Sequence, residues 1–156
     1  MGERADELRR IIDAYKFENA KAAHKVLAQL LSERIGHLPS SSVTIVPVPT
    51  VSSHIRKRGY DHMLLIAKEL AKQQNMPLNS RILRRATSTQ QRGASKKQRL
   101  LQAAKGFEID KPINGGIYLL IDDVVTTGAT INAAAKVLLG AGADEVWIGI
   151  VARQPI

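Results

Sequence analysis

Two adjacent carboxylates and a hydroxyl-rich turn stand together late in the sequence. Asp122 and Asp123 follow the apolar run Ile117–Ile121, and the next turn, Thr126–Thr130, contains three threonines and one glycine. The threonine hydroxyls can donate hydrogen bonds to an anion, and Gly128 has no Cβ to keep the anion from the backbone amides. The carboxylates can accept hydrogen bonds from vicinal hydroxyls. A phosphate and a diol together describe a ribose 5-phosphate.

The elements around this stretch predict a binding edge. The run 117–121 predicts a strand, and the helical segment 132–139 follows the turn. In a parallel α/β sheet, ligands bind beyond the carboxyl ends of the strands, and a helix that starts there directs its amides and positive dipole end at the same place. The turn lacks the lysine of a P-loop and the Gly-x-Gly-x-x-Gly of a dinucleotide fold. The pattern therefore favours a single phosphate monoester.

The remaining periodicity predicts the other elements. Residues 23–35 and Asp61–Gln74 have apolar residues at helical spacing, with Asp61 as a candidate cap. Val43–Val48 and Val146–Val151 are apolar and β-branched, which predicts buried strands. Shorter strands are expected at Ile82 and Leu83 and at residues 106–110.

Four segments carry a resemblance to a known family. Ile121–Thr130 resembles the phosphoribosyl-diphosphate (PRPP) signature of type I phosphoribosyltransferases. Val46–Pro49 (Val-Pro-Val-Pro), Arg56–Tyr60 (Arg-Lys-Arg-Gly-Tyr) and the segment from Gln91 to Phe107 make the chain similar to the ComF/GntX branch of that superfamily. The resemblance implies an α/β fold of the type I phosphoribosyltransferases, with a mostly parallel central sheet flanked by helices, in one domain over residues 1–156.

The resemblance also implies roles for the late stretch. Asp122 and Asp123 would be the catalytic residues, which fix the ribose hydroxyls and reach Mg²⁺ directly or through water. Purine-salvage relatives often have an aspartate where this chain has Thr126, so purine salvage is disfavoured and no general base can be named. The 5-phosphate of PRPP would be held by Thr126, Thr127, Gly128, Ala129 and Thr130.

The turn after the first predicted strand is basic. We expect Thr50–Tyr60 to form a loop, and the resemblance implies that this loop holds the pyrophosphate of PRPP. Arg56 and Arg58 are the candidates, because the planar guanidinium binds phosphate in a bidentate way. Asp61 stands where relatives often have asparagine, so it is expected to cap the next helix rather than to bind a ligand.

A second basic segment lies before the acidic pair. Eight lysines or arginines and no acidic residue occur between Arg81 and Lys105, and the polar middle, residues 87–93, predicts a mobile loop. The resemblance implies that residues 84–105 form a hood over PRPP, with Arg85 and Arg99 on its phosphates. The alternative is a nucleic-acid contact through phosphate charge, without base stacking, because interleaved aromatic residues are absent.

Length, composition and charge limit the number of domains and the kinds of ligand. A chain of 156 residues suits one domain, and a net charge of +9 suits either a polyanion or a compact pyrophosphate. ComF-type proteins usually carry a cysteine-rich zinc module; the chain has no cysteine, so this module is expected to be lost or trimmed. The charged start and the lack of a long apolar run predict a cytoplasmic protein with no membrane contact.

Two functions follow. The first is a Mg²⁺-dependent phosphoribosyltransferase in which an unidentified nitrogen acceptor displaces pyrophosphate at ribose C1. The second, implied by the branch, is a DNA-uptake accessory of natural competence that binds single-stranded DNA and a helicase partner, with PRPP as a regulatory ligand. A homodimer is compatible with both. A receiver domain of a signalling relay is disfavoured, because its acidic pair normally follows the first strand, whereas this pair lies late.

Overall fold

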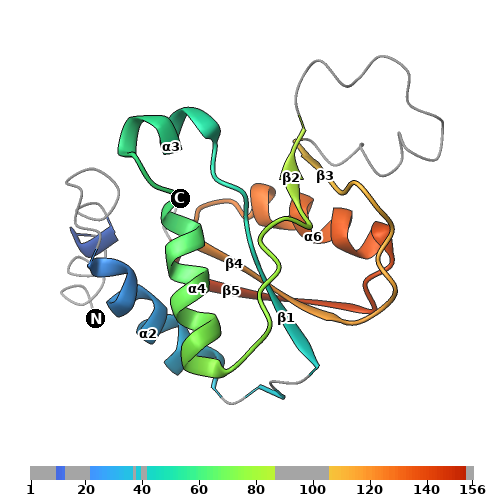
Figure 1. The fold of residues 1–156 in the computed structure, drawn as a ribbon, viewed down its shortest axis with the longest axis horizontal. Helices are drawn as coiled ribbons and strands as arrows, with labels where there is room; N and C mark the ends of the chain where they lie inside the picture. The colour runs from blue at the N-terminus through green and yellow to red at the C-terminus, as the bar shows by residue number, and fades with distance from the viewer. Residues whose placement is uncertain (1–9, 13–21, 37, 40–41, 87–105, 154–156) are drawn as a thin grey trace.

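The computed structural model describes residues 10–12, 22–36, 38–39, 42–86 and 106–153. Figure 1 shows strands in the middle of the molecule with helices on both sides. In chain order the elements are α2 Ala23–Ile35, β1 Val43–Pro47, α3 Ser52–Arg58, α4 His62–Gln74, β2 Arg84–Arg85, β3 Phe107–Glu108, β4 Ile117–Val125, α6 Ala129–Ala141 and β5 Glu145–Arg153.

The central sheet is parallel and has the order β1-β4-β5. On the outer side of β1, Ile45 forms a parallel bridge with Leu78, in which the amide of Asn79 donates to the carbonyl of Ile45 at 2.9 Å. Because the strands run the same way, the loops after β1 and β4 meet at one edge. The amide of Val48 donates to the carbonyl of Ile121 at 2.9 Å, so the loop after β1 begins directly beside Asp122.

Both faces of the sheet are covered, as Figure 1 shows. Successive side chains of a strand point to opposite faces. Leu119 of β4 therefore packs into the core with α2 and α4, whereas Leu120 packs into the core with α6 and β3. Burial on both faces explains why the strands are continuous apolar runs. The predicted α/β architecture, with a parallel sheet between helices, is confirmed.

The ends of the helices follow their local chemistry. Asp61 caps α4 as predicted: its Oδ1 accepts from the amides of Met63 at 3.1 Å and Leu64 at 3.2 Å. Gly142 ends α6 in the left-handed conformation. The predicted helix at 23–35 is confirmed, and no described helix is long and apolar enough to cross a lipid bilayer.

Three expected boundaries were wrong. The turn after β1 is not a simple loop, because Ser52–Arg58 forms the helix α3, which Gly59 ends at φ 77°. The strand expected at Ile82 and Leu83 lies two residues later, and these two side chains pack into the α6 core instead. β4 continues through both acids to Val125, and α6 already begins at Ala129. The apolar pattern therefore predicts a strand that is too short and a helix that starts too late.

Candidate active site

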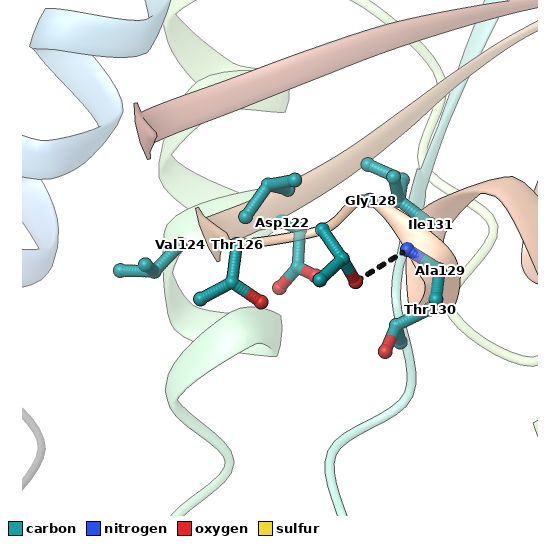
Figure 2. A pocket seen from close by; sticks show the side chains of 9 residues that line it. Asp122, Val124, Thr126, Gly128, Ala129, Thr130 and Ile131 are labelled. Atoms are coloured by element: carbon teal, nitrogen blue, oxygen red, sulfur yellow. Dashed lines mark hydrogen bonds between the residues drawn. The ribbon is translucent and has the colours of Figure 1, made fainter. Parts of the chain in front are cut away.

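A polar hollow opens where β4 ends and α6 begins. Figure 2 shows Asp122 on one side and the loop with Gly128 and the first turn of α6 on the other. It contains about 250 Å³ of space not occupied by atoms, solvent included. The enclosed part of the hollow holds about 50 Å³, far below the roughly 300–1,000 Å³ of pockets that enclose a whole small molecule, so it suits one end of a ligand. It is lined by Asp122, Val124, Val125, Thr126, Thr127, Gly128, Ala129, Thr130 and Ile131.

The loop geometry presents amides to this hollow. Gly128 is the N-cap of α6 at φ 79° and ψ 0°, a left-handed conformation that disfavours residues with a Cβ. The first backbone bond of the helix runs from Asn132 N to Gly128 O at 2.9 Å, so the amides of residues 129–131 have no acceptor within the helix. Thr127 Oγ1 accepts from the Ala129 amide at 3.3 Å. Such a helix start suits an anion.

The two adjacent acids point to opposite faces of the sheet. Asp122 is half-buried and lines the hollow. Asp123 is only 4% exposed, and its Oδ2 lies 3.0 Å from Nε2 of His62 on α4. The sequence predicts both carboxylates at the ribose, but only Asp122 lines the hollow, because β4 continues as a regular strand through both residues. The catalytic and metal-binding roles of both acids stay predictions.

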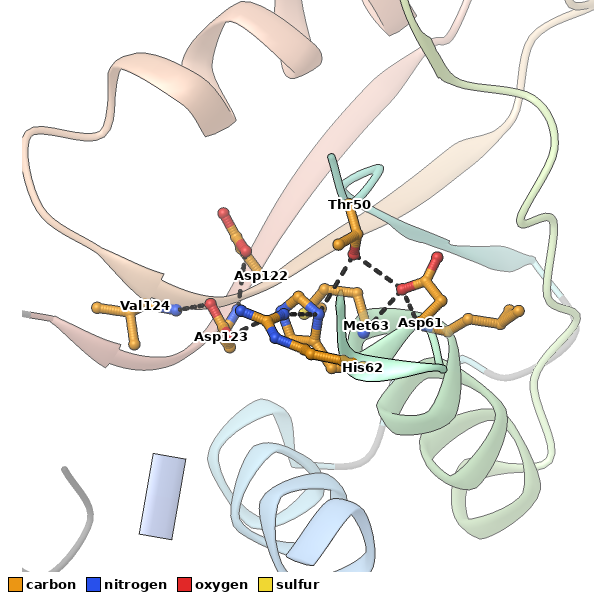
Figure 3. Close-up of polar contacts among 9 residues, drawn as sticks. Thr50, Asp61, His62, Met63, Asp122, Asp123 and Val124 are labelled. Atoms are coloured by element: carbon orange, nitrogen blue, oxygen red, sulfur yellow. Dashed lines mark hydrogen bonds and ion pairs between the residues drawn. The ribbon is translucent and has the colours of Figure 1, made fainter. Parts of the chain in front are cut away.

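A polar network surrounds the buried acid, as Figure 3 shows. Arg58, the last residue of α3, places NH1 2.9 Å from Nδ1 of His62. Thr50 Oγ1 donates to Asp61 Oδ1 at 2.8 Å and lies 3.4 Å from the same His62 nitrogen. Sequence reasoning missed His62. The one available signal was its position four residues after Arg58 and directly after a predicted helix cap.

The candidate pyrophosphate residues have different surroundings. Arg56 is exposed, whereas Arg58 is half-buried and contacts His62. Residues two apart on a helix do not face each other, so α3 directs the two guanidinium groups to different sides. Burial raises the pKa of the neighbouring Tyr60 phenol, an effect that the positive charge of Arg58 partly offsets, so this phenol is neutral at physiological pH.

The first residues of the predicted hood are anchored to the rest of the fold. Arg85 Nε donates to the carbonyl of Pro49 at 2.8 Å, and its guanidinium lies 5.1 Å from the ring centroid of Phe107. Arg84 forms an exposed ion pair with Asp110. Arg99 and residues 87–105 lie outside the described part of the chain. The phosphate contacts of Arg85 and Arg99 therefore stay predictions.

A metal ion at this site would need oxygen atoms from the bound substrate as well as from the protein. Within the described residues there is no group of three or more histidine, cysteine, aspartate or glutamate side chains that could hold an ion. Mg²⁺ commonly keeps several waters and binds through one or two carboxylates plus substrate phosphates. The half-buried Asp122 at the hollow fits such a site as a single protein ligand.

Comparison with known proteins gives relatives over nearly the whole chain. Competence protein F of Haemophilus influenzae is 30% identical over 162 residues, which cover 98% of this chain and 71% of the relative. DNA utilization protein YhgH of Escherichia coli K12 is 28% identical, covering 92% of this chain and 66% of the relative. Competence protein ComFC of Streptococcus pneumoniae is 31% identical, covering 85% of this chain and 57% of the relative.

Solved structures share the fold. The allosteric regulatory enzyme of purine biosynthesis aligns with a TM-score of 0.57 and 19% identity over 84% of this chain and 26% of its own. Orotate phosphoribosyltransferase from Aeropyrum pernix aligns with a TM-score of 0.53 and 21% identity over 85% of this chain and 72% of its own. The family model of the phosphoribosyl transferase domain matches residues 14–156. The chain therefore belongs to the phosphoribosyl transferase domain family, and its relatives there include competence protein F.

Proposed function

We propose that the chain binds PRPP and transfers its phosphoribosyl group to a nitrogen acceptor. The observation that carries this proposal is the hollow at the carboxyl end of β4, where a half-buried carboxylate faces a helix start across a threonine-rich loop. A ribose 5-phosphate has complementary groups at the same two ends. Thr126–Thr130 would hold the phosphate, and Asp122 would accept hydrogen bonds from the ribose hydroxyls.

The reaction is a displacement at ribose C1. The nitrogen lone pair of the acceptor forms the new bond to C1 while the bond from C1 to the pyrophosphate oxygen breaks, and the electron pair leaves with pyrophosphate. The acceptor nitrogen then loses its proton to solvent. Binding the remote 5-phosphate places C1 for attack, and Arg56 would attract the charge that develops on the leaving group. Arg85 and Arg99 would help to offset that negative charge if residues 84–105 close over the ligand.

The metal would supply charge neutralisation. Mg²⁺ bound with PRPP makes pyrophosphate a better leaving group. The chain's own contribution is the carboxylate of Asp122, held in place because its Oδ1 accepts from the amide of Asp123 at 2.9 Å.

Calorimetric titration tests the proposal. The wild-type chain should bind PRPP with Mg²⁺ and, more weakly, ribose 5-phosphate, whereas ribose without phosphate should not bind. Thr130→Val removes an exposed hydroxyl of the phosphate loop and should weaken binding of both ligands. Thr44→Val makes the same change near the amino end of β1 and should leave both affinities as they are. No binding of PRPP by the wild-type chain would contradict the proposal.

A second candidate function is a role in DNA uptake. It is favoured by the names of the relatives, two of which are competence proteins and one a DNA utilization protein. The net charge of +9 and the basic segment from Arg81 to Lys105 agree with binding of a polyanion. In this function the chain binds single-stranded DNA beside a helicase, and PRPP regulates it.

Salt dependence tests this second function. Fluorescence anisotropy with a labelled single-stranded oligonucleotide should give an affinity that falls steeply with salt. Neutralising Arg92, Lys96 and Lys97 should reduce the slope by about one per lost phosphate contact. Neutralising three exposed lysines on helices, Lys68, Lys72 and Lys136, removes the same number of charges as a matched control and should change little. A flat salt dependence of the wild-type chain would exclude this function.

A further inference from the structure

One buried histidine connects the two halves of the proposed site. The His62 side chain is 8% exposed and lies in the first turn of α4. It contacts Asp123 of β4 through Nε2 and Arg58 of α3 through Nδ1. β1 and β4 are neighbouring strands, so His62 lies between the element that follows the first strand and the tip of the second.

The partners of His62 define its tautomer. A guanidinium has hydrogen-bond donors and no acceptor, so Nδ1 of His62 must accept from Arg58 across their 2.9 Å separation. We therefore expect the ring proton on Nε2, which lies 3.0 Å from Asp123 Oδ2. A doubly protonated ring would place two donors against each other at Arg58. His62 therefore lies between a cation and a carboxylate.

This chain of contacts reaches the hollow. The amide of Asp123 donates to Asp122 Oδ1 at 2.9 Å, so the residue that His62 holds also orients the carboxylate that lines the pocket. At the other end of this series of contacts, His62 contacts Arg58, which lies on the same helix as Arg56. The His62 ring therefore contacts both α3 and the end of β4.

We propose that His62 is a positioning residue that fixes the basic helix α3 and the acidic end of β4 in the relative placement needed to bind both ends of PRPP. The proposal rests on the proposed PRPP-binding function. It assigns His62 no contact with the ligand. Groups that orient metal-ligating side chains typically change affinity or activity by about 10- to 100-fold when removed, and we expect a loss of similar size here.

The two ends of PRPP can be tested separately. Ribose 5-phosphate reports on the hollow, and pyrophosphate with Mg²⁺ reports on α3. His62→Leu removes both the donor and the acceptor, and it should weaken binding of both fragments by about tenfold or more. His62→Gln keeps a donor and an acceptor near the same positions and should restore both affinities. Ile66→Ala, one turn along α4 in the same core, is the control for loss of stability and should leave both affinities unchanged.

Nitrogen-15 NMR of the histidine rings tests the tautomer directly. The chain has four histidines, and comparison with the His62→Gln spectrum assigns the signals of His62. We expect a protonated Nε2 and an unprotonated Nδ1. The opposite tautomer, or a doubly protonated ring, would overturn the proposal even if His62→Leu does not fold.

The outcomes separate this proposal from the one before it. If the wild-type chain binds no PRPP, the proposed function fails, and the role of His62 fails with it. If the wild-type chain binds PRPP but His62→Leu binds both fragments as tightly as Ile66→Ala, only the positioning role is wrong. If His62→Leu weakens one fragment alone, His62 serves a single half of the site and does not link the two.

Discussion

Asp122 and Asp123 are neighbours in the chain but lie in opposite environments. Asp122 faces the open hollow beside the threonine-rich loop, whereas Asp123 is buried against His62. The alternation of side chains along β4 causes this difference. The half-buried carboxylate lines the hollow that would receive the ligand, and the buried one contacts α4 behind it. The same residue type therefore serves binding at one position and positioning at the next.

The largest expected effect is on stability, at the buried acid. Asp123→Ala leaves the donor of His62 buried without its acceptor, which should lower the free energy of unfolding by about 3 kcal/mol. Asp122→Ala should cost much less, because Asp122 is half-buried at an open hollow. Urea denaturation of both variants measures the difference. Equal losses would show that the two acids do not differ as described.

Asp122 should show the reverse pattern, with a larger effect on binding than on stability. Asp122→Asn removes the charge that would accept hydrogen bonds from the ribose hydroxyls, and PRPP affinity should fall about 30-fold, as expected for loss of a charged hydrogen bond. The denaturation midpoint should change little. Calorimetry with PRPP and Mg²⁺ measures the affinity. An unchanged affinity would remove Asp122 from the proposed site.

Much of this contrast could not be predicted from the sequence. The acid pair, the threonine turn and the parallel sheet were recognisable, because apolar strands and a glycine-containing turn leave local patterns. The burial of Asp123 depends on contacts with α4, far away in the chain, so a pattern of two adjacent acids could not separate them. His62 was missed for the same reason: its partners Arg58 and Asp123 come from two different elements.

The surroundings of the arginines also could not be predicted from the sequence. The sequence makes Arg56 and Arg58 equal candidates for the pyrophosphate, because both stand in one basic turn. The turn proved to be the helix α3, and helical geometry separates two residues at this spacing. The phosphate contact of Arg85 stays a prediction, and its contacts with the carbonyl of Pro49 and the ring of Phe107 are ones that only the tertiary structure brings together.

The loop beside Asp122 should be sensitive to backbone strain. Gly128→Ala places a Cβ at φ 79°, which should cost about 1–2 kcal/mol of stability and weaken ribose 5-phosphate binding, because the amides at the start of α6 would shift. Gly36→Ala at the end of α2 is the control for strain: at φ 64° and ψ −153° it lies in a region that is essentially restricted to glycine, and no atom lies within 4 Å of the added Cβ. It should lose stability but retain affinity. Equal loss of affinity in both variants would mean that strain, and not the loop, is responsible.

The smallest expected effect comes from the exposed counterpart of the His62–Asp123 pair. Arg84 and Asp110 form an ion pair whose side chains are 50% and 58% exposed. Solvent and salt screen such a pair, and the side chains lose conformational freedom when they form it. Arg84→Ala should therefore change the free energy of unfolding by about 0.5 kcal/mol or less. Urea denaturation at low and high salt measures the change, which should shrink further as salt rises. A loss as large as that of Asp123→Ala would mean that burial does not decide how much an ionic contact stabilises this fold. The exposed pair would then contribute as much as the contact that is enclosed between β4 and α4.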